Sequence, residues 1–191
     1  IDASEGVAAQ GVETSVGLLL TFDTRQPPYD DVRVRRALNE AIDKQLIFDQ
    51  MLKGRGAILN GQMLTSNTFG ANPDLKPIPF DLENAKALLA EAGYSDGFET
   101  SITTRSGKYL SDVDIANVIA GMFLNVNVQA GVNVVEQGVF SKMVKAREMG
   151  PLHMVGWYSL GDADFATVWF TEASGRAYWK NDEYEEFFLK A

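Results

Sequence analysis

Hydrophobic residues along the chain follow two different spacings, and their alternation predicts an α/β fold. Short apolar or β-branched runs without helical spacing, which are typical of strands, lie at 16–22, 98–104, 132–136 and 152–157. Stretches with apolar residues three or four positions apart, which are typical of amphipathic helices, lie at 30–52, 81–92, 111–126 and 139–149. This order predicts a mostly parallel or mixed sheet flanked by helices.

The first two elements can be predicted in more detail. The apolar run VGLLLTF at 16–22 is typical of a strand that is buried on both faces. After Asp30 and Asp31, which suit a helix N-terminus, apolar residues at i+4 spacing continue to Leu46. We therefore expect one long helix from about residue 30 to Leu52.

Capping and turn residues mark the later boundaries. Asp81 suits the N-cap of a helix and Gly93 the position just after its end. Ser111 and Asp114 form a variant of the capping box at the start of another helix. Residues 57–79 are rich in Asn-Gly, Asn-Pro and Pro-Ile-Pro turns, which predicts an excursion across the surface.

Composition narrows the function. The 191 residues include 26 acidic and 17 basic side chains, so the formal net charge is −9. Nucleic acid and anionic membranes repel such a chain, and we expect neither as a partner. The absence of cysteine excludes thiolate metal sites and cysteine nucleophiles, and the single histidine, His153, excludes a multi-histidine metal site. We expect one domain and no cofactor.

The ends of the chain also carry an expectation. The first residue is Ile1 rather than Met, and a predicted last helix at 182–190 reaches the final residues. We therefore expect a processed form or a part of a longer protein, with any export signal outside this sequence.

Two blocks of sequence resemble a known family. PYDDVRVRRALNEAIDK at 28–44 resembles the D-x-R-V-R-x-A-L-x-x-A-I-D signature of the extracellular solute-binding proteins of the peptide/nickel class (family 5), which serve ABC importers. FDLENAKALLAEAGYSDGF at 80–98 is similar to that family's D-x-x-K-A-K-x-L-L-x-E-A-G-Y-x-D-G-F block. GWYSLGDAD at 156–164 is a weaker match to its G-W-x-x-x-x-x-D segment. The family's L-x-x-I-G-I-x-V run is altered at 124–134, so we expect a reshaped helix-to-strand junction there.

The resemblance implies a two-lobed fold of the type II periplasmic-binding-protein kind. Residues 1–191 would form a single α/β lobe, the second, and the first lobe would lie outside this chain. Such a protein is not an enzyme: it captures a small peptide-like solute between its lobes and delivers it to the membrane permease of an ABC importer. The resemblance also implies a periplasmic or extracellular location, with a lipoprotein anchor as one option.

The resemblance implies roles for three residues of the third block. Asp162 would pair with the α-amino group of the ligand, because a desolvated ammonium needs a charge-assisted partner. Trp157 and Tyr158, at the end of a predicted strand, would supply flat apolar contact and hydrogen bonds. The alternative is a solvated Asp162 in a turn and a Trp157 in the core.

Arg105 is the fourth candidate ligand residue. It follows the predicted strand at 98–104, at the sheet edge where open α/β sheets usually bind ligands, and there it could face a carboxylate or a phosphate. A solvated arginine in a loop is the simpler alternative. The same doubt applies to its loop neighbours Ser106, Lys108 and Tyr109.

Two other functions stay open. A metal-assisted hydrolase could use Asp162 and Asp164, with His153 as a further group, although the loop lacks the glycine and the glutamate of an EF-hand. Asp164 also suits the N-cap of a helix through 165–170, which is the role we favour for it. The chain could instead be a protein-interaction domain without a transport function.

Several other residues are interpreted as structural. His153 alternates with apolar neighbours, so we expect it on one face of the sheet, satisfied by hydrogen bonds. Arg33, Arg35 and Arg36 lie close to acidic residues and are expected to pair with them. The methionines on apolar stripes, which fill the core, are Met122, Met143 and Met154.

Overall fold

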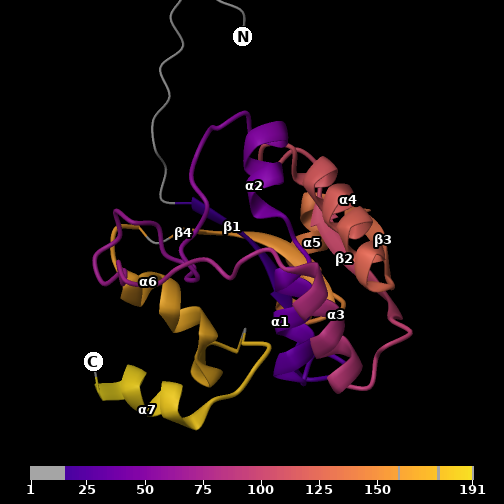
Figure 1. The fold of residues 1–191 in the computed structure, drawn as a ribbon. Helices are drawn as coiled ribbons and strands as arrows, with labels where there is room; N and C mark the ends of the chain where they lie inside the picture. Colours follow the sequence, from indigo (N-terminus) through magenta and orange to yellow (C-terminus); the bar gives the residue numbers. More distant parts are fainter. Residues whose placement is uncertain (1–15, 159, 176, 191) are drawn as a thin grey trace, which may run out of the picture.

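The computed structural model describes residues 16–158, 160–175 and 177–190, and the strands within them form one four-stranded sheet (Figure 1). In spatial order the strands are β1 (Val16–Phe22), β4 (Leu152–Tyr158), β2 (Phe98–Arg105) and β3 (Val128–Val135). β2 runs parallel to β3 and β4, whereas β1 runs antiparallel to β4. The predicted mostly parallel or mixed sheet flanked by helices is confirmed.

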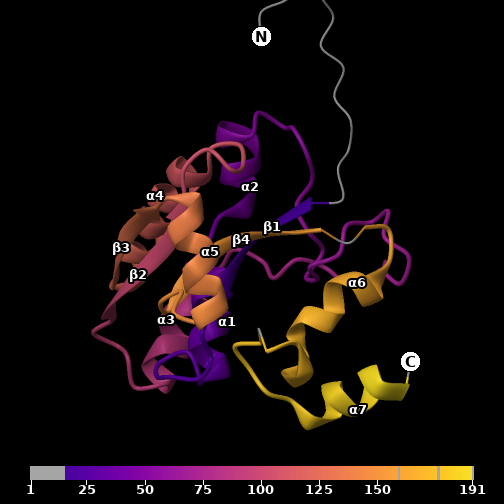
Figure 2. The ribbon, with the colours of Figure 1, turned by 180° about the vertical axis from the view of Figure 1, so that it is seen from behind.

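Helices cover both faces of the sheet. One face carries α1 (Val32–Glu40), α3 (Leu82–Glu91) and α4 (Asp112–Phe123), and α5 (Gln137–Ala146) lies on the other (Figures 1 and 2). A short α2 (Lys44–Leu46) continues into a π-helical turn, Ile47–Met51. The C-terminal segment contains α6 (Ala163–Thr167), the 3-10 turns Val168–Phe170 and Glu172–Ser174, and α7 (Asp182–Lys190). Among the helices described, none is long and apolar enough to cross a membrane.

Strand alternation separates an apolar face from a more polar one. Ile102 and Leu152 are fully buried in the core beneath α1, α3 and α4. Their strand neighbours Thr103 and His153 point to the opposite face, because successive side chains of a strand alternate. The large buried side chains of the core include Tyr29, Val34, Leu38, Leu89, Phe123, Val126 and Val128. The face beneath α5 therefore carries the buried polar side chains of Thr103 and His153.

β1 lies at the edge of the sheet, and the prediction that it is buried on both faces is wrong. Of its seven residues only Gly17 is buried, and the others are partly exposed. The segment 57–79 covers part of this strand, since a Cβ on Gly17 would lie 2.8 Å from Leu59 Cδ1. An apolar run alone does not distinguish an interior strand from an edge strand that another segment covers.

The first predicted helix is divided in two. α1 ends at Glu40, whose buried carboxylate accepts hydrogen bonds from Arg36 Nε (2.8 Å) and Asn84 Nδ2 (2.6 Å). Asp43 is the N-cap of α2, and its side chain accepts a hydrogen bond from the Leu46 N–H at 2.9 Å. The i+4 apolar spacing continues across the break, which is why the pattern predicted one helix.

Two predicted helix caps are confirmed and one is wrong. Asp31 and Asp81 each accept a backbone N–H from the first turn of their helix. Ser111 has a φ of 54° and makes no capping hydrogen bond. The next residue, Asp112, replaces it by accepting backbone N–H groups, and those groups belong to residues 107, 108, 109 and 113. Burial alone would raise the pKa of Asp112, but these hydrogen bonds outweigh burial and lower it.

The boundaries around β3 and α5 also differ from the prediction. A 3-10 turn, Leu124–Val126, and Asn127 with a φ of 62° lead directly from α4 into β3, which begins at Val128 rather than residue 132. Arg147, with a φ of 58°, ends α5 before Gly150. Left-handed residues other than glycine end both helical stretches, and their sequence signal is weak.

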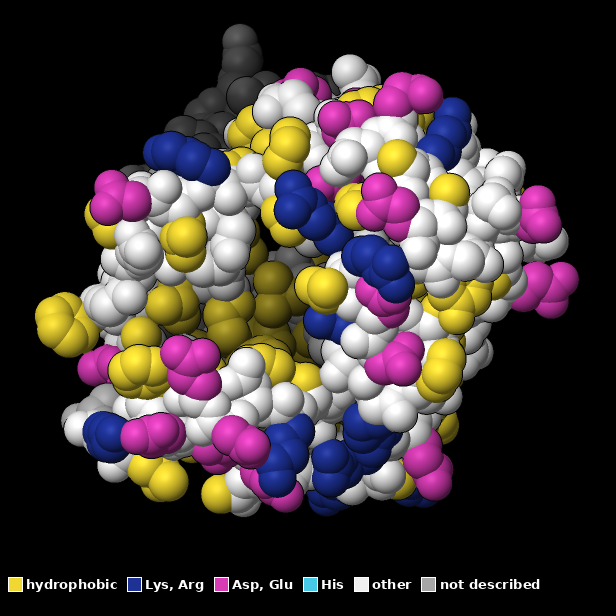
Figure 3. All heavy atoms as spheres, turned by 60° about the horizontal axis from the view of Figure 1, so that its bottom comes forward, with side chains coloured by type: hydrophobic (Ala, Val, Ile, Leu, Met, Phe, Trp, Pro, Cys, Tyr) yellow, Lys and Arg dark blue, Asp and Glu magenta, His cyan; other side chains and the backbone are white. Residues whose placement is uncertain are grey.

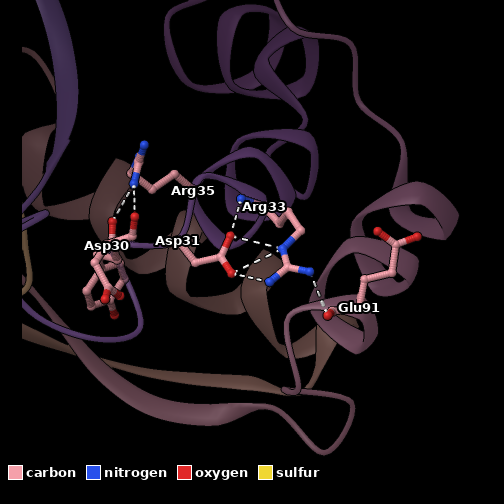
Figure 4. A network of polar contacts seen from close by, with 6 residues as sticks. Asp30, Asp31, Arg33, Arg35 and Glu91 are labelled. Atoms are coloured by element: carbon pink, nitrogen blue, oxygen red, sulfur yellow. Dashed lines mark hydrogen bonds and ion pairs between the residues drawn. The ribbon is translucent and has the colours of Figure 1, made fainter. Parts of the chain in front are cut away.

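The arginines of α1 are structural, as predicted, but among the described residues only Arg33 and Arg36 pair with carboxylates. Arg33 pairs with Asp31 (Nη2 to Oδ2, 2.6 Å) and donates to the backbone oxygen of Glu91 at the end of α3 (2.8 Å; Figure 4). Arg35 donates to the backbone oxygens of the turn before α1, and Arg36 pairs with Glu40. These bonds join α1 to α3 and to the turn that precedes it.

Candidate functional site

The carboxyl edge of the parallel strands is the candidate site, because the chain leaves two neighbouring strands there in opposite directions. From β2 it turns to α4 on the core face, and from β4 it turns to α6, whose segment packs on the other face. Open α/β sheets bind ligands in the crevice that such a switch creates. Three side chains reach this edge from different elements: Arg105 from β2, Trp157 from β4 and Gln137 from the start of α5.

Arg105, the last residue of β2, is buried at this edge and held by its neighbours. Nη1 donates to Gln137 Oε1 at 3.1 Å, and Nη2 donates to the hydroxyl of Tyr109 at 3.0 Å. The guanidinium carbon lies 4.0 Å from the ring centroid of Phe140 in α5, which is a cation–π contact. Arg105 is only 8% exposed, so its interpretation as a solvated loop arginine is wrong.

Tyr109 connects Arg105 to β4. Its hydroxyl accepts the backbone N–H of Gly156 at 3.0 Å, and its ring crosses β4 so closely that a Cβ on Gly156 would lie 2.5 Å from ring carbons. Asp112 fixes the loop that carries Tyr109 by accepting its backbone N–H at 3.0 Å. We call this arrangement the Arg105 site, and it consists of Arg105, Tyr109, Gln137, Phe140 and the N–H of Gly156.

The Arg105 site contains no counter-charge within the described part of the chain. Arg105 forms no ion pair with a described Asp or Glu, and its hydrogen-bond acceptors are an amide oxygen and a phenol oxygen. Its Nε has no partner among the described residues. A carboxylate stabilises a buried cation far better than neutral acceptors do. The site therefore favours an anionic group.

The two aromatic candidates on β4 have different surroundings. Trp157 packs against Trp169 and Phe170, with ring centroids 6.3 and 5.5 Å away, and its Nε1 is buried without a partner among the described residues. Tyr158 ends the strand opposite Val16 and is 42% exposed. Trp157 directly follows Gly156, so the structure brings it next to the Arg105 site.

Asp162 is exposed and caps α6. Its Oδ1 accepts the backbone N–H of Asp164 at 3.0 Å. The expectation that Asp164 would be the cap is wrong, because the helix begins at Ala163 and Asp164 falls in its first turn. Within the described residues, no hydrogen bond or ion pair joins Asp162 to Arg105. The structure therefore does not bring these two candidates into contact.

The segment 57–79 reaches the same turn. The N–H of Phe69 donates to the Gly161 oxygen at 2.9 Å, and the N–H of Ala163 donates to the Phe69 oxygen at 3.0 Å. Leu64 within this segment is buried, whereas the side chain of Phe69 is 79% exposed. The start of α6 is thus held by a segment that is distant in sequence.

A hollow lies on the face that Figure 1 shows at its bottom. Hydrophobic side chains cover its floor, and charged side chains lie mainly around its rim (Figure 3). The C-terminal segment is itself rich in aromatic contacts, including Trp179 with Tyr184 at 5.2 Å. The hollow therefore offers apolar contact rather than charge.

His153 lies on the polar face of the sheet, next to Tyr178 of the C-terminal segment, with ring centroids 5.1 Å apart. Its Nδ1 has no partner among the described residues, so the prediction that hydrogen bonds satisfy it is wrong for this atom. Burial lowers the pKa of His153 to about 4, although the charge of Asp23 opposes this shift. The described residues contain no group of three His, Asp or Glu side chains placed to hold a metal ion.

Comparison with known proteins now identifies the family. The model of the bacterial extracellular solute-binding proteins, family 5 middle region, matches residues 1–178. The chain belongs to this family. It is 32% identical over 161 residues to the dipeptide-binding protein of Escherichia coli (strain K12), a match that covers 81% of this chain and 30% of that protein. It is 42% identical over 81 residues to heme-binding protein A of Haemophilus influenzae, covering 42% of this chain and 15% of that protein.

A solved structure shows the same fold. HbpA2 from Haemophilus parasuis superposes with a TM-score of 0.84 and 28% sequence identity over 94% of this chain and 37% of that one. The resemblance predicted from the blocks at 28–44 and 80–98 is confirmed. This family 5 chain spans 37% or less of each of these three proteins.

Gln137 and Phe140 are residues of the Arg105 site that the sequence pattern did not indicate. In the sequence, Phe140 is only one of the apolar residues of the helix predicted at 139–149. Gln137 lies 32 residues from Arg105 in the chain. One signal was available: Gln137 follows the carboxyl end of β3, and parallel strands bring such residues to one edge.

Proposed function

We propose that this chain is one lobe, the second, of a two-lobed solute-binding protein that captures a small peptide-like solute and delivers it to an ABC importer. Membership of family 5 supports a binding role, and the relative named a dipeptide-binding protein supports a peptide-like solute. The proposal includes a periplasmic or extracellular location, free or anchored as a lipoprotein. The proposed partners are the solute, the first lobe and the membrane permease.

The observation that carries the proposal is the uncompensated charge of Arg105. Its buried guanidinium lies where open α/β sheets bind ligands, and its hydrogen-bond and cation–π partners among the described residues are neutral. A carboxylate of the solute would supply the missing counter-charge through short charge-assisted hydrogen bonds. A peptide carries such a carboxylate at its C-terminus.

The other three candidates would contact the rest of the solute. Asp162 would pair with an α-amino group, since its Oδ2 accepts no hydrogen bond from the described residues. Trp157 would offer the N–H of its indole to a peptide oxygen, and the exposed ring of Tyr158 would lie along the solute. A dipolar solute is thus proposed to lie between Arg105 and the start of α6.

Binding would act through a change in lobe position. A solute that contacts both lobes stabilises the closed form, and the permease would distinguish this form from the open one. One lobe alone retains only part of the contacts. We therefore expect this chain by itself to bind the solute far more weakly than the whole protein does.

We propose that the protein performs no catalysis and needs no cofactor. A hydrolase requires a nucleophile, a base and an orienting group within hydrogen-bond reach of each other. Asp162 and Asp164 lie on the exposed turn at α6, whereas His153 is buried against Tyr178. The described residues do not assemble these three groups into such a set.

Native mass spectrometry of the full-length mature protein, purified under gentle conditions, tests this function. We expect a stoichiometric solute that contains a carboxylate and an amine. The variant Asp162→Asn should lose most of it while keeping the α6 cap, because asparagine also caps helices. Asp164→Asn is the matched control and should retain the solute. A protein that remains unliganded after incubation with pooled peptides would contradict the proposal and favour the protein-interaction alternative.

A further inference from the structure

Among the described residues, the hydrogen-bond and cation–π partners of Arg105 are all uncharged, although the acidic Glu136 precedes one of them in sequence. The guanidinium touches the amide of Gln137, the hydroxyl of Tyr109 and the ring of Phe140. Glu136, adjacent to Gln137, is exposed and forms no ion pair with Arg105. The contacts thus fix the position of the cation without neutralising it.

Gln137 is itself held in one orientation. Its Nε2 donates to Ser141 Oγ at 3.1 Å, and Ser141 Oγ in turn donates to the backbone oxygen of Gln137 at 3.0 Å. With the amide nitrogen engaged along α5, the amide oxygen is the atom left to accept from Arg105 Nη1. The helix therefore presents a fixed neutral acceptor to the arginine.

Tyr109 fixes the opposite side of the guanidinium. Its hydroxyl accepts from Arg105 Nη2 and from the Gly156 N–H, both at 3.0 Å. The first bond holds the arginine and the second attaches it to β4. Two neutral oxygens from different elements therefore hold the two terminal nitrogens of Arg105 apart from any carboxylate of the described chain.

We infer that Gln137 is a positioning and specificity-determining residue: it orients Arg105 while leaving its charge uncompensated, so the site selects solutes with a free carboxylate over their neutral amides. This inference rests on the proposed function. The residue type matters because a glutamate in the same place would pair with Arg105 and remove the charge that a solute carboxylate needs.

Substitution of Gln137 by glutamate tests the inference in the full-length mature protein. The probes are an equimolar pool of dipeptides and a matched pool of their C-terminal amides, and retained solutes are quantified by native mass spectrometry. We expect the wild type to prefer acids over amides by about 10- to 100-fold, the range for a hydrogen-bonded charged group. In Gln137→Glu the preference should fall at least about tenfold, through loss of acid binding, with no fall in thermal stability.

Two further variants separate the positioning role of Gln137 from the effect of an added negative charge elsewhere and from simple loss of its hydrogen-bond acceptor. Gln50→Glu makes the same change at an exposed position that has no bond to Arg105, and it should leave the preference unchanged. Gln137→Met removes the acceptor without adding charge, so it should weaken acid binding yet keep acids preferred over amides.

The possible outcomes separate this inference from the function on which it rests. Retention of the wild-type preference by Gln137→Glu would overturn the inference alone. Equal binding of acids and amides by the wild type would overturn the carboxylate role of Arg105 and the inference together. Binding of neither pool would overturn the proposed function as well.

Discussion

Arg33 and Arg105 are held in opposite ways, although both make several hydrogen bonds. Arg33 lies at the surface, where the Asp31 carboxylate approaches to 2.6 Å and neutralises it (Figure 4). Arg105 is buried, and its hydrogen-bond acceptors among the described residues are the neutral oxygens of Gln137 and Tyr109. A surface ion pair is already balanced and screened by salt, whereas a buried cation without a counter-charge can still attract an anion strongly. Charge balance, and not the number of hydrogen bonds, separates the structural arginine from the candidate ligand residue.

Substituting each arginine in turn tests whether the two differ in their contribution to solute binding. In the full-length protein, Arg105→Met should weaken binding of a retained dipeptide by about 4 kcal/mol, or about a thousandfold, because one partner of a buried charge pair is lost. Arg33→Met should leave the affinity within about twofold, since it alters a surface pair. Isothermal titration calorimetry measures both values. Similar losses in the two variants would show that the contrast has no functional meaning.

The second prediction extends the comparison to His153, which burial keeps neutral. Its pKa is about 4 in the folded protein and about 6.5 in the unfolded chain. Between these values the unfolded chain binds more protons, so stability is lost as the pH falls from about 6.5 toward 4. The difference corresponds to about 3 kcal/mol. Urea denaturation at a series of pH values should show this decrease in the free energy of unfolding.

His153→Phe provides the control for that titration. It keeps a ring against Tyr178 but removes the titrating group, so the free energy of unfolding should change little between pH 6.5 and 4.5. Burial opposes ionisation of the neighbouring Asp23, but hydrogen bonds from Arg25 outweigh burial and lower its pKa. Its stabilising effect has the same sign and is lost only at lower pH. An unchanged pH slope in His153→Phe would contradict the assignment to His153.

The third and smallest prediction concerns the packing that holds the Arg105 site. In Gly156→Ala the new Cβ would press on the ring of Tyr109, and we expect a loss of about 2 kcal/mol in stability. The double variant with Tyr109→Ala should be more stable than the sum of the single losses, because the clash is absent. Denaturant titration of the four proteins measures this coupling. Additive losses would show that Tyr109 does not cross β4 as described.

The spacing of apolar residues predicted the order of strands and helices. Single residues were predicted correctly where their hydrogen bonds are made within a few positions of the chain. The caps at Asp31 and Asp81 are examples, because each side chain bonds to its own first turn. The break after α1 was missed because the i+4 apolar spacing continues across it, and the bond from Asn84 to Glu40 at the end of α1 joins residues that are distant in sequence. The prediction at Ser111 failed for a different reason, because the next residue, Asp112, accepts backbone N–H groups of the loop before the helix as well as that of Val113.

The sequence indicated the sheet edge at which the candidate site lies, but not the residues that surround Arg105 there. The position of Arg105 at the end of a parallel strand indicated the sheet edge at which it lies. Its burial was not predictable, because it depends on Phe140 and Gln137, which reach it from α5. The bridge from Tyr109 to Gly156 spans 47 residues, and no spacing rule indicates it. Contacts of this kind are set by tertiary packing and not by local pattern.

A crystal structure of the full-length protein with its retained solute tests the central claim most directly. The account predicts a carboxylate of the solute within hydrogen-bond distance of the Arg105 guanidinium, with the bonds to Gln137 and Tyr109 intact. If a carboxylate from the rest of the protein instead pairs with Arg105, the claim that this buried charge is reserved for the solute is contradicted.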